Sequence, residues 1–192
     1  MKARVIQLSA LIFTLLLTAC TQNGIKDAKN WPVNDFTYTD QQGKTFGLKD
    51  LEGKIWVADF IFTNCETVCL PMTSNMAKLQ KMAKENGIEN IQFVSFSVDP
   101  SVDTPDALTQ YGKLSGVDFN NWKFLTGYEQ LEIEKFARDN FKTIVKKPEK
   151  GDQVIHGTDF YLIDQTGKIV KDYTGFQEIP FDEIMNDIKA LQ

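Results

Sequence analysis

The chain has 192 residues, of which 42% are hydrophobic, and its 21 basic and 26 acidic side chains give a formal net charge of −5. This length suits one domain with one hydrophobic core, and the acidic balance excludes a basic stripe of the kind that binds nucleic acid. Three cysteines and one histidine limit the places where thiol or soft-metal chemistry can occur.

The first 20 residues have the order of a secretory signal. A short basic start precedes an apolar stretch over 11–17, and Leu-Thr-Ala precedes Cys20. The stretch is shorter than the roughly 20 residues that cross a bilayer. Leu-Thr-Ala-Cys is typical of bacterial lipoproteins, in which the cysteine is acylated and becomes the new N-terminus; an ordinary signal peptide with a chance cysteine is the less favoured alternative. We predict a signal peptide over 1–19 and lipidation of Cys20.

Cleavage before Cys20 removes two basic residues, so the mature chain has 173 residues and a formal net charge of −7. Residues 20–30 are polar and lack periodicity, which predicts a tether from the lipid to a domain over 31–192. No later segment is apolar enough to span a membrane. We therefore expect a domain at the extracytoplasmic face of a bacterial cell membrane, held there by its lipid.

Strands and helices alternate along the first half of the domain. Segments 36–38 and 44–48 flank a Gln-Gln-Gly turn and predict an opening hairpin. The apolar run 55–62 predicts a central strand covered on both faces, and 91–98 predicts a second one. Between them, apolar residues at helical spacing predict a helix led by Met72 that ends at an Asn-Gly stop.

The second half continues the alternation. Thr104, followed by proline and aspartate, is a good start for a helix, and 131–141 predicts another. Segments 160–163 and 168–173 predict a hairpin, and 181–191 a last helix. This order predicts an α/β fold with a mixed central sheet and helices on both faces, without a repeat, a second domain or a glycine-rich phosphate loop.

Cys65 and Cys69 carry the clearest chemical signal. They lie between the central strand and the following helix, where free N–H groups and the helix dipole favour thiolates. Their spacing places them on one helix face with Cα atoms about 6 Å apart, so they can form a disulfide or bind one metal ion. One disulfide across so short a loop stabilises a domain of this size little. The pair is therefore more chemical than structural, although two buried unpaired cysteines are the plain alternative.

His156 is the only histidine, and it follows the charged segment 146–153. A lone histidine is more often a bystander than a ligand, but in a thioredoxin-like sheet the start of strand 160–163 faces the helix end that bears the cysteines. Two thiolates and an imidazole suit copper in either oxidation state better than hard ions, and zinc with an open position stays an alternative. Met72 is a conceivable further ligand, but its spacing favours packing in the core.

An ordered set of motifs carries a family likeness. TNCETVCLP over 63–71, then SVDP over 97–100 with DTP over 103–105, and then a single histidine before FYLI over 160–163, resemble the Sco (SenC) family. The likeness covers about 31–191.

The resemblance implies a membrane-attached, thioredoxin-like domain that helps to build the CuA centre of cytochrome c oxidase subunit II. By that resemblance Cys65, Cys69 and His156 are ligands of Cu(I) or Cu(II). The protein is then a metallochaperone rather than an enzyme, with subunit II as partner and an upstream copper donor or thiol reductant beside it. The family pattern is C-P-x-x-C-P; here Glu66 and Leu70 stand in place of the prolines, which shape the loop and are not ligands.

Three acidic residues near these motifs have open roles. Asp99 and Asp103 belong to a family motif, and we favour a turn acid and a helix cap for them. Asp59 lies within an apolar strand, so it must be hydrogen-bonded or neutral. It stands six residues before Cys65, like the buried aspartate of thioredoxins that tunes thiol protonation. The alternative is that the strand bends and Asp59 meets a backbone donor.

The rival function is an extracytoplasmic thiol–disulfide oxidoreductase that reduces the copper-site cysteines of the oxidase. Reductases of the thioredoxin type carry C-x-x-C and a proline opposite the pair. Here the spacing is one residue longer, and no proline stands between Pro148 and Pro180. A peroxidase is disfavoured because no arginine is near the cysteines, and a sensor without delivery stays open. The composition of 146–153 predicts a mobile segment on which His156 swings in and out. We favour the copper metallochaperone.

Overall fold

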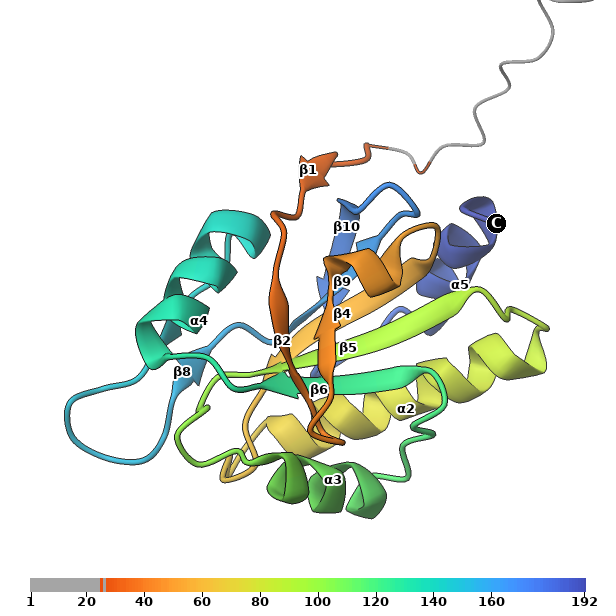
Figure 1. Ribbon diagram of the computed structural model, residues 1–192. Coiled ribbons are helices and arrows are strands. Elements are labelled where there is room, and N and C mark those ends of the chain that lie inside the picture. The colour runs from red at the N-terminus through yellow and green to blue at the C-terminus, as the bar shows by residue number, and fades with distance from the viewer. Residues whose placement is uncertain (1–24, 26) are drawn as a thin grey trace, which may run out of the picture.

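The computed structural model describes residue 25 and residues 27–192, so the predicted signal peptide and Cys20 lie outside it. Eight strands form one sheet in the order β1-β10-β9-β4-β5-β6-β2-β3, and β7 and β8 form a separate ribbon (Figure 1). The strands are β1 (Trp31–Pro32), β2 (Thr37–Asp40), β3 (Thr45–Gly47), β4 (Ile55–Ile61), β5 (Ile91–Ser97), β6 (Trp122–Thr126), β7 (Val145–Lys146), β8 (Ile155–His156), β9 (Asp159–Ile163) and β10 (Lys168–Thr174).

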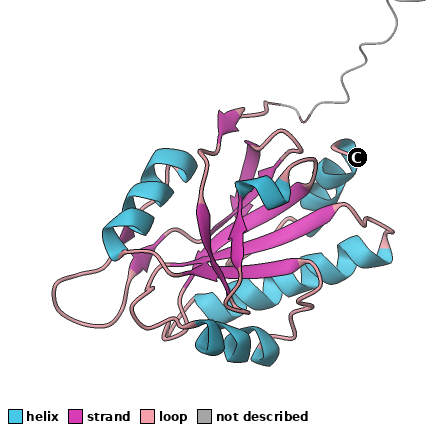
Figure 2. Cartoon of the chain, in the orientation of Figure 1, coloured by secondary structure: helices cyan, strands magenta, loops and turns pink. Residues whose placement is uncertain are grey.

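Among residues 27–192, four α-helices accompany the strands (Figure 2). They are α2 (Cys69–Glu85), α3 (Pro105–Leu114), α4 (Gln130–Phe136) and α5 (Phe181–Ala190), with a 3-10 turn η1 (Leu48–Leu51) and a π-helical turn η2 (Ala137–Phe141) that continues α4. None of the helices within residues 27–192 is long and apolar enough to cross a membrane.

The central strand β4 makes the sheet a mixture of parallel and antiparallel pairs. Strand β4 pairs in parallel with β5 and antiparallel with β9, and every residue of β4 and β5 is buried. Parallel strands covered on both faces read as unbroken apolar runs, which is the pattern of both segments. The predicted mixed α/β sheet with an N-terminal hairpin is confirmed.

Helices cover both faces of the sheet. On one face, Phe60 and Phe96 stack at 5.5 Å between ring centroids and meet Phe136 and Phe141 from α4 and η2. The other face is covered by α2, alongside which α5 lies, with the Lys78 ammonium 4.1 Å from the Phe181 ring centroid. This arrangement leaves the C-terminal end of β4 joined directly to the start of α2.

The two-residue strands β1, β7 and β8 were not predicted, and two longer elements also differ from the predictions. Strand β6 was not predicted, because it is short and carries a lysine at its second position. That Lys123 forms an ion pair with Asp40 of β2 at 2.8 Å, so a partner in the fold allows the charge there. Helix α2 begins at Cys69, one turn before the predicted Met72.

The chain contacts the domain before residue 31. Ile25 is buried in the core, and the Lys29 backbone N–H donates to the Val170 carbonyl at 3.0 Å. Trp31 then pairs with Ile169 as β1 joins the edge of the sheet. The boundary between tether and domain stays a prediction. Within the predicted tether, Ile25 and Lys29 make these contacts with the domain.

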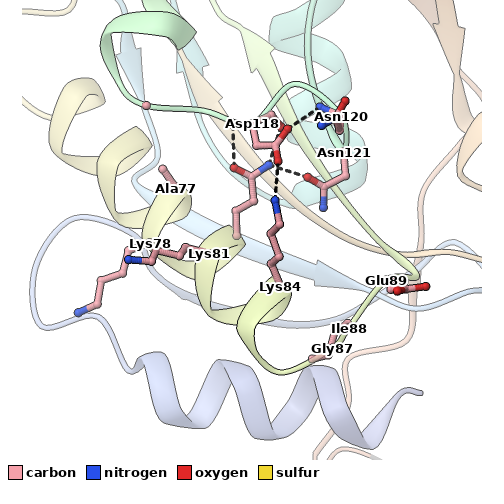
Figure 3. Close-up of a pocket in the computed structure, with 12 residues that line it drawn as sticks. Ala77, Lys78, Lys81, Lys84, Gly87, Ile88, Glu89, Asp118, Asn120 and Asn121 are labelled. Carbon is pink, nitrogen blue, oxygen red and sulfur yellow. Dashed lines mark hydrogen bonds and ion pairs between the residues drawn. The ribbon is translucent and has the colours of Figure 1, made fainter.

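A hollow of about 720 Å³ lies along the C-terminal half of α2, away from the cysteines (Figure 3). The Gln80 amide bonds to Asn121 Oδ1 at 2.6 Å at its wall, and Lys84 pairs with Asp118 at 3.4 Å. The residues that line it include neither cysteine nor histidine. The thiol site is therefore not in this hollow.

Candidate metal centre

The three predicted ligands come together at the C-terminal end of β4. One ligand atom from each of Cys65, Cys69 and His156 lies within 4.8 Å of the others, and Cys69 Sγ is 3.4 Å from His156 Nε2. Ligands at bond lengths of about 2.0–2.3 Å from one ion are about 3.5–4 Å apart. The arrangement can therefore hold a single ion after a small closure.

The loop that bears the cysteines is braced by Asp103. This buried carboxylate accepts the Thr63 backbone N–H at 3.1 Å and the Thr63 hydroxyl at 2.6 Å, and it also accepts the Ser97 hydroxyl at 2.6 Å. The predicted helix-cap role of Asp103 is wrong, because Thr104 caps α3 by accepting the Ala107 N–H at 3.2 Å. Asp103 ties the start of the cysteine loop to the end of β5 instead.

A cysteine sulfur stands in for the missing side-chain cap of α2. Val68 at the N-cap makes no side-chain hydrogen bond, and the Cys69 backbone N–H donates to Cys65 Sγ at 3.4 Å. Pro71 in the first turn has no N–H and so needs no partner there. The helix start thus offers its N–H group and its dipole to the Cys65 sulfur, which favours the thiolate.

The two thiols differ in charge. Hydrogen bonding from the Cys69 side chain lowers the pKa of the Cys65 thiol well below its ordinary value, with His156 and backbone groups adding to the effect against partial burial. The same bond, together with complete burial, raises the pKa of Cys69 above its ordinary value. Before metal binds, Cys65 is therefore a reachable thiolate and Cys69 a buried thiol.

His156 is held by the ribbon rather than by the main sheet. It pairs with Val145 across β7 and β8, and its ring meets Phe62 edge-on at 5.7 Å between centroids. Its Nδ1 lies 2.8 Å from the Gly157 carbonyl oxygen, and a carbonyl oxygen can accept a hydrogen bond but not donate one. The N–H of a neutral ring is therefore on Nδ1, and the Nε2 lone pair faces Cys69 as a metal ligand requires.

The segment before His156 is tied at both of its ends. The Lys147 ammonium donates to Asp99 at 2.6 Å, and the Lys147 backbone N–H donates to Glu134 at 3.0 Å. At the other end Gln153 bonds to the cysteine loop. Residues 149–152 between these ties are exposed. The swinging motion predicted for His156 stays a prediction, and it requires these contacts to break.

Asp99 has the predicted turn role and one role more. Its carbonyl accepts the Val102 N–H at 3.0 Å and its carboxylate accepts the Ser101 hydroxyl at 2.9 Å, which confirms a turn acid. Its ion pair with Lys147 joins that turn to the segment that leads to His156. The sequence alone did not indicate this pair, because its two residues are 48 positions apart.

Asp59 is a buried acid beneath the site. It is fully buried in β4, and neither carboxylate oxygen has a hydrogen-bond partner among the described residues. Burial raises the pKa of Asp59 to about 7, and Ser95 and His156 oppose the rise only in part. The predicted alternative of a backbone donor is therefore wrong.

Met72 is fully buried in the hydrophobic core, as its helical spacing predicts.

Two positioning features were missed by the sequence analysis. Gln153 lies in a segment whose composition indicates only an exposed loop, and nothing local marks its partners. Gly157 packs so closely that a Cβ atom there would lie 2.1 Å from Thr143 Oγ1. A glycine directly after the sole histidine was the available signal.

The fold and the site together define a class. A cysteine pair where a central parallel strand meets a helix, in a mixed sheet with helices on both faces, marks a thioredoxin-like domain, and an imidazole beside the thiols adds a third soft donor.

The chain belongs to the SCO1/SenC family, whose model matches residues 26–192. It is 49% identical over 183 residues to the SCO1 protein homolog of Bacillus subtilis, covering 95% of this chain and 94% of that protein. A SCO1/SenC family lipoprotein from Bacillus anthracis is 55% identical, with a TM-score of 0.85 over 88% of this chain and 99% of the other. ScoI of Bradyrhizobium japonicum with copper bound is 27% identical, with a TM-score of 0.69 over 84% and 99%.

Proposed function

We propose that this domain is a copper metallochaperone that delivers its ion to the CuA centre of cytochrome c oxidase subunit II. The convergence of Cys65, Cys69 and His156 within 4.8 Å carries the proposal. The Sco family is one of cytochrome c oxidase assembly proteins, and the Bradyrhizobium relative holds copper. Copper is the cargo here, so binding and release are equally parts of the function.

The two thiols and the imidazole divide the work of binding. Cys65 presents a thiolate that copper can reach, and Nε2 of His156 already presents its lone pair. Cys69 must lose its proton before it can bind, because only a thiolate is a strong ligand. Each copper bound therefore releases a proton, and copper affinity falls as the pH falls.

The location of the domain follows from the same proposal. We place it outside the cytoplasmic membrane, held by lipid on Cys20. The Leu-Thr-Ala-Cys run supports this, and the Bacillus anthracis relative is a lipoprotein. A membrane-bound copper carrier needs an upstream copper donor, and a thiol reductant must keep its two cysteines reduced.

A second candidate function is reduction of a disulfide in the oxidase. The reachable thiolate of Cys65 favours it, because a thiolate is the attacking species in disulfide exchange. Cys65 would form a mixed disulfide with the target, and Cys69 would displace the target as a free thiol, leaving a Cys65–Cys69 disulfide. A disulfide switch is described in BsSco of the same family.

Anaerobic copper titration of the reduced domain lacking residues 1–20 tests the proposal. We expect one copper per domain, and intense sulfur-to-metal charge-transfer absorption in the Cu(II) form. Serine at either cysteine should abolish that absorption, and His156→Ala should weaken binding. Copper uptake with unchanged spectra in the Cys65→Ser protein would contradict the proposal.

A further inference from the structure

One side-chain amide joins the segment that carries His156 to the cysteine loop. Gln153 Nε2 donates to the Asn64 carbonyl at 3.0 Å, and Gln153 Oε1 accepts the Glu66 backbone N–H at 3.3 Å. A primary amide can make both bonds at once because it carries a donor and an acceptor. Asn64 and Glu66 are the two neighbours of Cys65 in the chain. Gln153 therefore clamps the backbone on both sides of a predicted ligand.

Little else joins the two segments. Between residues 63–69 and 146–157, both described throughout, the hydrogen bonds are the two of Gln153 and the contact of Cys69 with His156 itself. The ribbon fixes His156 relative to Val145, but β7 and β8 share no ladder with the main sheet. Gln153, three residues before His156, is thus the tie that does not depend on the ligands.

We propose that Gln153 is a positioning residue, a latch that holds His156 against the cysteine pair and slows the release of copper. The inference rests on the proposed copper-binding function. With both hydrogen bonds broken, the segment can carry His156 away and leave copper on two thiolates, which an incoming ligand can then attack. The latch is reversible because Gln153 is only half-buried, so water can replace each bond.

The segment is anchored at its other end, at Lys147, so the release of Gln153 leaves it to turn about that residue as about a hinge. Lys147 stays anchored through Asp99 and Glu134 when Gln153 lets go. The exposed stretch 149–152 between the anchors bears no buried side chain that would have to be unpacked. Opening therefore costs the two amide bonds, the His156 contact and the pairing of β8 with β7, together with the packing of one core side chain, Val154.

The test compares three variants of the full-length protein in detergent. Gln153→Ala removes both bonds, while Gln153→Glu keeps an acceptor for Glu66 but turns a carboxylate oxygen toward the Asn64 carbonyl. Lys150→Ala, at an exposed position of the same segment, is the matched control. Copper release to a chelator in excess should be about tenfold faster in both Gln153 variants, equivalent to about 1.4 kcal/mol. Lys150→Ala should match the unmodified protein.

A second substitution separates positioning from general loosening. In a His156→Ala background, Gln153→Ala should add no further increase in release rate, because the latch acts through His156. An equal tenfold increase in that background would overturn the proposal, as would release at the unmodified rate in Gln153→Ala. The thermal midpoint of the metal-free protein should stay unchanged, and a large drop would assign Gln153 to stability instead.

Hydrogen exchange of the metal-free protein tests whether Gln153 holds the two segments together, even if the protein binds no copper. Gln153→Ala should speed amide exchange at 64–66 and 153–157 while β4 and α2 keep their protection. Unchanged exchange in both stretches would overturn the latch. If the unmodified protein takes up no copper while exchange responds as expected, the proposed function has failed and the latch has not.

Discussion

The two halves of the site are built from different parts of the molecule. Cys65 and Cys69 lie where a fully buried strand meets a long helix, and Asp103 braces their loop. His156 lies on a two-residue strand of a separate ribbon. The thiol half takes its rigidity from the centre of the hydrophobic core, whereas the imidazole half depends on two core side chains of the ribbon, Val145 and Val154, and on a few hydrogen bonds near the surface. A carrier that must both hold and release copper gains from this division.

The division has an energetic basis. Cys69, Met72 and Met76 are fully buried on α2, so moving the cysteines means unpacking the core. The bonds that hold His156 are single hydrogen bonds, each worth about 0.5–1.5 kcal/mol net. Substitutions in the thiol half should therefore change stability, and substitutions in the imidazole half should change the affinity and rate of metal exchange while the fold persists.

The largest effect expected is the loss of oxidase assembly without His156. Cells carrying His156→Ala should fail to assemble a CuA-type oxidase, because copper would lack its third protein ligand. The same purified variant should still reduce a generic disulfide, since exchange needs only the two thiols. Oxidase activity in cells and disulfide reduction in vitro, measured on this one variant, provide the comparison.

The cysteine variant is the control for this experiment. Cys65→Ser should fail in both assays, because the nucleophile and a ligand are lost together. If oxidase assembly survives without His156 but fails without Cys65, the division of the site is not used for copper delivery. Disulfide reduction would then become the favoured function.

A smaller effect is expected in the thiol half, where Asp59 is buried. Its pKa is about 7 in the folded protein, above the ordinary 3.8. Between these values the unfolded chain ionises while the folded one stays protonated, so stability falls as the pH rises, by up to about 1.4 kcal/mol per unit. Below about pH 3, a unit under the ordinary pKa, both states are protonated and the penalty is absent.

Asp59→Asn removes this dependence. The unfolding free energy of the variant minus that of the unmodified protein should rise between pH 4 and pH 7 and then stay level, in urea denaturation of the reduced domain. Asp35→Asn, at an exposed position, controls for the change in net charge. A difference independent of pH would show that Asp59 is ionised within the folded core.

Much of the thiol half could be predicted from sequence because its signals are local. The unbroken apolar run of β4, the helical spacing after it and the four-residue cysteine interval all depend on neighbours in the chain. Asp103 was misjudged because a residue before a proline-started helix resembles a cap, whereas its partners Thr63 and Ser97 are set by the sheet. Strand β6 was missed because its lysine pairs with a distant strand.

In the imidazole half, the sequence identifies the ligand His156 but not the contacts that hold it in place. His156 stood out as the sole histidine, yet its support comes from Lys147, Gln153 and Gly157, whose partners lie far away in the chain. The composition of 146–153 indicated mobility, which reflects side-chain chemistry and not the hydrogen bonds that the fold supplies. Sites built on surface ribbons depend on long-range contacts that local patterns do not contain.

The smallest effect tests how closely the ribbon positions the imidazole. The Gly157 carbonyl accepts the Nδ1–H of His156, and a Cβ atom at 157 would lie 2.1 Å from Thr143 Oγ1. In Gly157→Ala either the Thr143 side chain or the ribbon must move, and we expect the ribbon to move and turn Nε2 away from Cys69. We expect copper binding weakened about tenfold, or about 1.4 kcal/mol, with an unchanged thermal midpoint, measured by competition with a chelator.

Removing the obstacle should restore the site. Thr143→Ala takes away the hydroxyl and leaves the Thr143 Cβ 3.4 Å from the new methyl group, a distance that a small adjustment accommodates. The double variant should then regain most of the affinity, while Thr143→Ala alone should bind copper as the unmodified protein does. If the double variant binds as weakly as Gly157→Ala, the loss does not arise from this contact. In that case the ribbon does not set the approach of His156, and the contrast between the two halves of the site would rest on the Gln153 latch alone.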